Sequence, residues 1–231
     1  MQKKKTLTSS QIKDRYNLRN LLLKTEATFS LDFKTQENRM AAYIVENRRD
    51  AQVFIEDKDI HKAKGKELNV TRNKGKTINH GLTYGMGKLL LAAELKMTVN
   101  EASNLIKVFW EKNPELYQFN ETLKLAKEIE TPLFKRKLKL VGRTKLNWII
   151  QGSCAELLKA LIYLFTESTV KVLPHFHDEL VLKCLVCKNH TNKPCQPILK
   201  VKSNIENLYP FVWPVRDKQG QEVKVFKLEV K

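Results

Sequence analysis

Long apolar segments are missing from this sequence. No hydrophobic run approaches the roughly 18 residues that a membrane-spanning helix needs. The start, MQKKKTLTSSQIKDRYN, is basic, but no apolar stretch of the kind found in secretory signals follows it. We therefore expect no membrane partner. Apolar residues still make up 42% of the 231 residues, which is enough for one large domain or two small ones.

Acidic residues are scarce relative to basic ones. Asp and Glu total 25 against 42 Lys and Arg, which gives a formal net charge of +17. The basic residues gather in two clusters: Lys62, Lys64, Lys66, Arg72, Lys74 and Lys76, and then Lys135, Arg136, Lys137, Lys139, Arg143 and Lys145. Runs of this kind neutralise phosphates and release counterions. The charge predicts a nucleic acid partner, and the alternative is a basic surface that serves only solubility.

Cysteine is also rare, and without a secretion signal we expect reduced thiols rather than a disulfide framework. Cys154 lies in an apolar helical pattern and is expected in the core. The remaining thiols form the pattern Cys184-x2-Cys187-x2-His190-x4-Cys195. These ligand types suit tetrahedral Zn²⁺, although the second gap is shorter than usual. A zinc site and unliganded thiols both stay open.

The periodicity predicts an α+β fold. Phe29, Leu31 and Phe33 alternate with polar residues as in a strand, which puts Asp32 on the opposite face. The patterns predict helices at 39–53, 72–84, from Thr98 onward, 116–129 and 155–165, an exposed strand at 134–141, a hairpin at 170–186 and a strand at the C-terminal end. A sheet with a helical insertion follows from this order.

Two aspartates are candidates for metal binding. Asp32 lies near the end of a predicted strand, and Asp178 lies at the predicted hairpin tip. Mg²⁺ takes carboxylate oxygens together with phosphate oxygens, and a pair of such ions can clamp a phosphoryl transfer. The alternative is that each aspartate caps its own turn.

The segment RNKGKTINHGLTYGMG carries an unusual stripe. Its chemistry-bearing side chains recur at every fourth residue and share one helix face: Arg72, Lys76, His80 and Tyr84. Cations at a helix start are unfavourable beside the helix dipole. The stripe therefore favours a triphosphate ligand, with a solvated charged face as the alternative.

These motifs resemble those of the family A DNA polymerases, in their C-terminal part. The family's D-Y-S-x-x-E-x-R appears here as DFKTQENR at 32–39. Its R-x-x-x-K-x-x-x-F/Y-x-x-x-Y-G appears at 72–85 with His80 at the aromatic position, and its H-D-E appears at 177–179. The segments at 57–68 and 147–159 are lesser matches in the same order.

The resemblance implies a polymerase palm, an antiparallel sheet with flanking helices, and a helical fingers insertion. It implies a polar N-terminal segment at 1–18, a first palm part at 19–56, fingers at 57–146 and a second palm part at 147–231. We expect thumb and exonuclease domains to be absent. A second polypeptide could then supply them.

The resemblance also implies residue roles. Asp32 and Asp178 would hold two Mg²⁺ ions, with Glu179 supporting the catalytic site. The incoming nucleotide would be bound by Arg72, Lys76, His80 and Tyr84, with Glu37 as the gate against a 2′-hydroxyl. DNA would be contacted by Arg143, Asn147, Gln151, His177 and Gly85.

The implied function is template-directed transfer of a nucleotide from dNTP to a primer 3′-OH. The partners would be primer-template DNA and dNTP, in the cytoplasm of a bacterial or phage-infected host cell. One alternative is a non-catalytic, nucleic-acid-binding remnant of such an enzyme. Another is a single-subunit RNA polymerase of the phage type, a group that lacks the gate glutamate, so Glu37 favours DNA.

Overall fold

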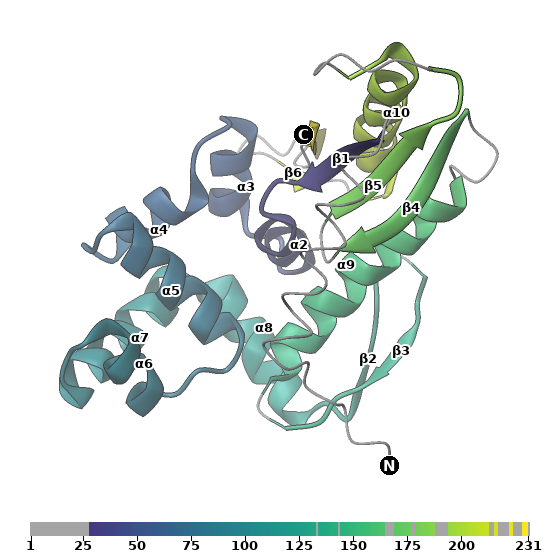
Figure 1. Cartoon of the computed structure of the whole chain (residues 1–231). Coiled ribbons are helices and arrows are strands. Elements are labelled where there is room, and N and C mark those ends of the chain that lie inside the picture. Colours follow the sequence, from purple (N-terminus) through teal and green to yellow (C-terminus); the bar gives the residue numbers. More distant parts are fainter. Residues whose placement is uncertain are drawn as a thin grey trace, which may run out of the picture. The chain divides into compact units, whose positions relative to one another are not determined.

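The structure is a computed structural model with an α+β fold (Figure 1). It describes residues 28–230, except 133, 143, 165–168, 177–178, 188–193, 213–214, 217–221 and 224–227. The elements are β1 (Thr28–Phe33), α2 (Gln36–Ile44), α3 (Arg48–Ile55), α4 (Ile60–Glu67), α5 (Arg72–Thr83), α6 (Lys88–Leu95), α7 (Val99–Lys112), α8 (Pro114–Leu125), β2 (Glu128–Glu130), β3 (Lys137–Lys139), α9 (Lys145–Leu164), β4 (Val170–Phe176), β5 (Glu179–Cys184), α10 (Gln196–Val212), β6 (Val215–Arg216), β7 (Glu222–Val223) and β8 (Leu228–Val230). None of the described helices has the length and apolar character to cross a membrane.

The chain divides into two compact units. The sheet unit comprises Met1–Lys34, Leu158–Asn207 and Lys227–Lys231. The helical unit comprises Thr35–Leu157 and Leu208–Phe226.

An antiparallel sheet of order β4-β5-β1-β8 forms the sheet unit, and β4, β5 and β1 run side by side in Figure 1. Phe29, Leu31 and Phe33 are buried on one face of β1, with Leu182 and Leu180 opposite Phe29 and Leu31. The other face carries Ser30 and Asp32, because successive strand residues point to opposite sides. The predicted strand and hairpin are thereby confirmed.

Glycines set the packing of α4 on α5 in the helical unit. A Cβ added at Gly75 would lie 2.6 Å from the backbone nitrogen of Gly65, closer than real side chains approach. A Cβ at Gly65 would meet the Val70 carbonyl oxygen at 2.9 Å. The two backbones can therefore touch only without side chains at these positions. This contact fixes which α4 residues lie beside the α5 stripe.

The ends of α5 follow standard capping chemistry. Thr71 accepts a hydrogen bond from the Lys74 backbone N–H at the start. After Tyr84 the chain turns at Gly85, which has φ +80°, and Met86 N–H donates to the Gly81 carbonyl at 2.8 Å. This is a left-handed glycine cap, and it gives Gly85 a structural role. The predicted capping box of Thr98 and Glu101 is confirmed at the start of α7.

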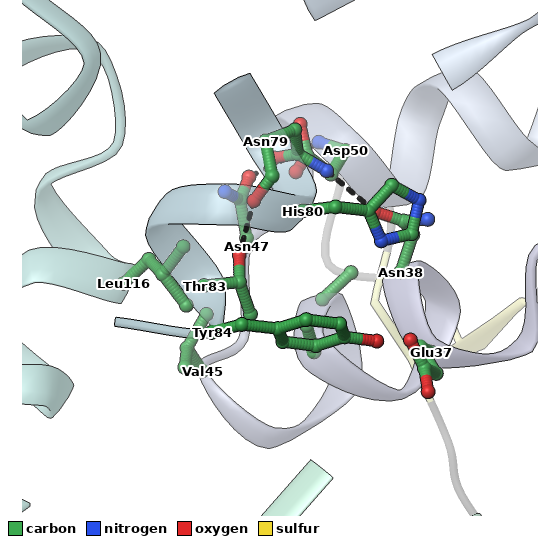
Figure 2. Close-up of a pocket in the computed structure, with 12 residues that line it drawn as sticks. Glu37, Asn38, Val45, Asn47, Asp50, Asn79, His80, Thr83, Tyr84 and Leu116 are labelled. Carbon is green, nitrogen blue, oxygen red and sulfur yellow. Dashed lines mark hydrogen bonds between the residues drawn. The ribbon is translucent and has the colours of Figure 1, made fainter. Parts of the chain in front are cut away.

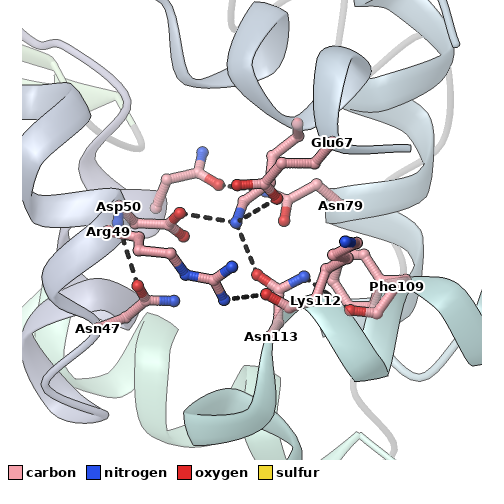
Figure 3. Close-up of polar contacts among 10 residues, drawn as sticks. Asn47, Arg49, Asp50, Glu67, Asn79, Phe109, Lys112 and Asn113 are labelled. Atoms are coloured by element: carbon pink, nitrogen blue, oxygen red, sulfur yellow. Dashed lines mark hydrogen bonds and ion pairs between the residues drawn. The ribbon is translucent and has the colours of Figure 1, made fainter. Parts of the chain in front are cut away.

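A buried lysine, Lys64, joins α4 to its neighbours, and Figure 3 labels its partners Asp50, Glu67 and Asn113. The Lys64 ammonium, 1% exposed, donates to Asp50 and to the Asn113 side chain, each at 2.6 Å, and lies 3.4 Å from Glu67. A charge this deeply buried is tolerated only when it is paired and hydrogen-bonded. The network thus ties α3, α4 and the α7–α8 junction together.

Some predicted helix bounds are wrong. The single helix expected at 39–53 is broken at Asn47, whose side chain caps α3 by accepting from the Asp50 N–H. The helix expected to reach residue 129 ends at Leu125, because Glu128–Glu130 pairs with Lys137–Lys139 as a two-stranded ribbon. The sequence patterns also did not predict α10, which buries Ile198, Val201 and Ile205.

Candidate active site

The predicted stripe lies along α5, and its first cation has a structural partner. Arg72 Nε donates to Asp59 Oδ2 at 2.7 Å, while the other oxygen of Asp59 caps α4 by accepting from the Lys62 N–H at 2.9 Å. Burial raises the pKa of Asp59, but the Lys62 N–H and the Arg72 guanidinium outweigh it and leave that pKa lowered. The pair is half exposed, so it contributes little stability.

One imidazole and a phenol follow along the stripe, and a second imidazole, His61 of α4, lies beside them. The His80 ring centroid lies 5.4 Å from that of His61 and 5.9 Å from that of Tyr84. Burial, and then the charge of Lys76, lowers the pKa of His80. Burial, and then His80, lowers the pKa of His61 to about 4. Both rings are therefore neutral near pH 7, and the described residues offer no hydrogen-bond partner to the buried Nδ1 of His61.

A pocket of the helical unit brings three predicted nucleotide-binding residues together: Glu37, His80 and Tyr84 all line it (Figure 2). Glu37 comes from α2, while His80 and Tyr84 come from α5 and its cap. Figure 2 shows the Tyr84 hydroxyl pointing toward the side where Glu37 lies. Asn79, a buried residue that also lines the pocket, donates to Asn38 at 2.6 Å and so links α5 to α2.

Two residues predicted to contact DNA lie on α9. Gln151 is exposed and its Nε2 donates to Glu37 Oε1 at 3.3 Å. The Asn147 Oδ1 is buried without a hydrogen-bond partner among the described residues. Gly85 is exposed beside Tyr84, at the end of α5. Arg143 lies outside the described residues.

The predicted carboxylates lie in the sheet unit. Asp32 on β1 is directly opposite Glu179 on β5, and its other neighbour in register is Glu229 on β8. Glu179 is 8% exposed and accepts a hydrogen bond from the Ser30 hydroxyl. Asp32 and Glu179 therefore share the polar face of the sheet. His177 and Asp178 lie outside the described residues.

The cysteines separate into one core residue and one group. Cys154 is buried within α9, as expected. Cys184, Cys187 and Cys195 have their sulfur atoms within 4.8 Å of one another. The fourth residue of the predicted pattern, His190, lies outside the described residues.

The sequence matches the model of DNA polymerase family A over residues 8–207. The chain belongs to DNA polymerase family A. This membership confirms the resemblance that the three motifs carry.

Curated DNA polymerases are identical to this chain at about a quarter of the aligned positions. DNA polymerase I of Helicobacter pylori is 27% identical over 179 residues, which cover 66% of this chain and 20% of that protein. The thermostable DNA polymerase I of Thermus aquaticus is 27% identical over 221 residues, which cover 83% of this chain and 26% of that protein. The chain thus spans about a fifth to a quarter of these relatives.

The fold is similar to that of a solved family member. The POL domain of Pol1 from M. smegmatis, in complex with DNA primer-template and dNTP, aligns with a TM-score of 0.69 and 18% identity. The alignment covers 89% of this chain and 39% of that one. The α+β palm-and-fingers architecture expected from the sequence is confirmed at the level of the fold.

Sequence reasoning missed residues that hold the predicted ones in place: Ser30, Asp59 and His61. The alternation of β1 could have identified Ser30, since it shares a strand face with Asp32. Asp59 and His61 lie in the DKDIH segment and reach α5 only through the glycine contact between helices, which no periodicity signals.

Proposed function

We propose that this chain is a template-directed DNA polymerase that transfers a nucleotide from dNTP to a primer 3′-OH. The observation that carries the proposal is the pocket shared by Glu37, His80 and Tyr84, at the end of a helix face that also bears Arg72 and Lys76. A nucleoside triphosphate offers a phosphate tail, a sugar and a base. The α5 stripe presents cations, imidazole and phenol in a matching order along one helix.

Arg72 and Lys76 are the groups proposed to bind the triphosphate. Both are exposed on the first turns of α5. Arg72 can exchange its partly exposed pair with Asp59 for a phosphate, to which a guanidinium binds with two parallel hydrogen bonds. His61 and His80, neutral at pH 7, add N–H donors without further charge. Phosphoryl transfer requires positioning and charge stabilisation from the protein more than covalent chemistry.

Glu37 is proposed as the gate against ribonucleotides. Its carboxylate lies on the pocket wall and accepts from Gln151 Nε2. A side chain held in this way has a defined position, which a steric gate needs. Tyr84, capping α5 beside it, presents a flat apolar ring for stacking against a base or sugar.

The carboxylates of the sheet unit fit magnesium. Asp32 and Glu179 offer hard oxygen donors from directly paired positions, and Ser30 fixes Glu179 by a hydrogen bond. Asp32, with Asp178, would hold two Mg²⁺ ions, and Glu179 would support them. Bound there, the ions would neutralise charge on the reacting phosphate and lower the pKa of the primer hydroxyl. Ser30 acts on this arrangement only by orienting Glu179.

DNA is proposed to contact the exposed Gln151 and the basic residues of the β2–β3 ribbon. Lys137 and Lys139 are exposed and alternate with Leu138, which packs against the site of Gly152. The two lysines therefore share one outward face of β3. The lysines share this face with Glu128 and Glu130 of β2, so a phosphate would replace those carboxylates as their partner, whereas an amide such as Gln151 suits base edges in the minor groove.

Primer extension tests the proposal directly. The chain, a primer-template and Mg²⁺ are incubated with each of the four dNTPs singly. We expect addition of the complementary nucleotide and none of the others. Equal addition of all four would contradict template direction, and tight DNA binding without any addition would favour the non-catalytic remnant. Parallel reactions with a candidate second polypeptide test the prediction that another chain supplies thumb or exonuclease parts.

A further inference from the structure

A group of thiols in the sheet unit lies apart from the chemistry described above. Cys184 is the last residue of β5, Cys187 follows in the next turn, and Cys195 directly precedes α10. Their sulfur atoms all lie within 4.8 Å of one another. Only Cys184 is fully buried, whereas Cys187 and Cys195 are half-buried, so core packing accounts for one of the three.

Backbone donors converge on the sulfur of Cys184. The N–H groups of Val186 and Cys187 both donate to its sulfur. The turn that brings them there is anchored by Leu185 N–H, which donates to the Thr169 carbonyl at 2.8 Å. Leu185 and Val186 point outward at 60% and 61% exposure, which leaves the inner side of the turn to the sulfurs.

Cys195 reaches the same point from the start of a long helix. Its carbonyl accepts from the Leu199 N–H at 3.0 Å, so it occupies the N-cap position of α10. The positive end of the helix dipole lies at this position and lowers the energy of nearby negative charge. Three thiolates gathered here would nevertheless repel one another without a cation between them.

We propose that Cys184, Cys187 and Cys195 bind a thiophilic divalent cation of the Zn²⁺ type, which fastens the end of β5 to the start of α10. Zn–S bonds of about 2.3 Å in a tetrahedron set the sulfurs about 3.8 Å apart, so a small contraction of the present group suffices. The thiols release their protons to solvent as the metal–sulfur bonds form, and no group is oxidised or reduced. Thiolates select this class of metal over Mg²⁺, which prefers oxygen.

Metal binding by these cysteines would affect the candidate active site through strand β5. β5 begins at Glu179, opposite Asp32, and ends at Cys184. A metal at the far end of this strand would restrain its register on β1. The site is therefore structural, and its occupancy is measurable without any assay of nucleotide addition.

Cobalt substitution tests the proposal. The 231-residue chain, reduced and stripped with a chelator, is titrated anaerobically with Co²⁺ in the presence of excess Mg²⁺. We expect one ion per chain, with sulfur-to-cobalt charge-transfer bands and the intense visible bands of a tetrahedral site, bleached by Zn²⁺. Cys187→Ala, at a half-buried position, should weaken Co²⁺ binding at least tenfold. Cys154→Ala, which removes the only other thiol, should leave it unchanged.

Several results would overturn the site. One is a folded, reduced chain that gives no cobalt–thiolate spectrum. Another is a spectrum of equal strength in the Cys187→Ala variant. A third is a disulfide between two of the three cysteines, detected by mass spectrometry of the freshly purified chain. If the Cys187 variant fails to fold, the wild-type titration decides alone: unfolding must occur at a higher temperature with Zn²⁺ than with chelator.

Discussion

Gln151 on α9 donates a hydrogen bond to Glu37 on α2 across 3.3 Å. The two residues are separated by 114 positions in sequence, and both belong to the helical unit. The bond matters because a glutamate on an open helix face would sample several rotamers. Held by Gln151, its carboxylate has one preferred place beside the pocket that His80 and Tyr84 also line. The proposed gate is thus a pair of residues rather than one.

Replacing the gate should relax sugar discrimination. We expect Glu37→Ala to raise ribonucleotide incorporation relative to deoxynucleotide by roughly tenfold or more, because the side chain that fills the space of a 2′-hydroxyl is gone. Gln151→Ala should produce a smaller change in the same direction. Glu94→Ala, at an exposed glutamate of α6 outside the pocket, is the control. Single-nucleotide addition measures the ratio, and an unchanged ratio in Glu37→Ala would assign the gate elsewhere.

A comparison of two lysines of α5 can distinguish a specific phosphate-binding site from a general effect of positive charge. Lys76 lies on the stripe, while Lys74, two residues away, lies about 200° around the helix. Both are exposed. We expect Lys76→Ala to lower kcat/KM for dNTP by roughly tenfold to a hundredfold, since it removes a charge-assisted contact with phosphate. Lys74→Ala should change it less than about twofold. Equal losses would mean that only the total charge matters.

Local periodicity was sufficient to predict the stripe and the strand. The helical repeat of α5 places Arg72, Lys76 and His80 on one face whatever surrounds the helix, and alternation gives the faces of β1. Contacts between helices could not be predicted in the same way. The pairing of Arg72 with Asp59 depends on the Gly65–Gly75 approach, which is a tertiary fit.

Helix ends were predicted wrongly for a related reason. The helical pattern continues across Asn47, so a single helix was expected, but the Asn47 side chain satisfies the Asp50 N–H and starts a new helix. Glu128–Glu130 is strand only because Lys137–Lys139 pairs with it. Its own three residues, EIE, carry no strand signal, and strand propensity depends on such partners.

Removing a proposed metal ligand should stop nucleotide addition without weakening DNA binding. We expect Asp32→Asn, and equally Asp178→Asn, to reduce nucleotide addition by roughly a thousandfold, which corresponds to about 4 kcal/mol of transition-state stabilisation. DNA affinity should change little, because phosphate contacts come from other residues. Asp57→Asn is a matched control at an exposed turn with φ 52°, which asparagine also tolerates. Extension by Asp32→Asn at the wild-type rate would refute the metal assignment.

Acidification should destabilise the helical unit through His61. Its folded-state pKa of about 4 lies below the ordinary 6.5, because burial and the neighbouring His80, Lys76 and Arg72 oppose the charge. Between these values the unfolded chain binds more protons, so stability falls as the pH falls through this window. His61→Gln should flatten the slope. Urea midpoints of the wild-type chain and of the His61→Gln variant, measured at several pH values, give the two slopes. Carboxylates titrate in both proteins, so the difference between the slopes isolates the contribution of His61. Parallel curves for the two proteins would contradict the assignment.

Salt dependence should show which lysines contact DNA. Phosphate contacts make log K fall with log salt by about 0.9 for each, so we expect primer-template binding to weaken steeply between about 50 and 200 mM salt. Removing Lys137 and Lys139 together, as the double Gln variant, should reduce the magnitude of the slope by about 2. The control is a double Gln variant at Lys107 and Lys124, which removes the same charge and, like Lys137 beside Glu128, takes lysines that lie near a glutamate.

The two double variants have equal net charge, so the comparison isolates position from total charge. If DNA lies against the outward face of β3, only the Lys137/Lys139 variant changes the slope. If both variants lower it equally, the +17 charge attracts DNA through its general field and the ribbon makes no direct contact. Fluorescence anisotropy on labelled duplexes, at several salt concentrations, supplies the slopes.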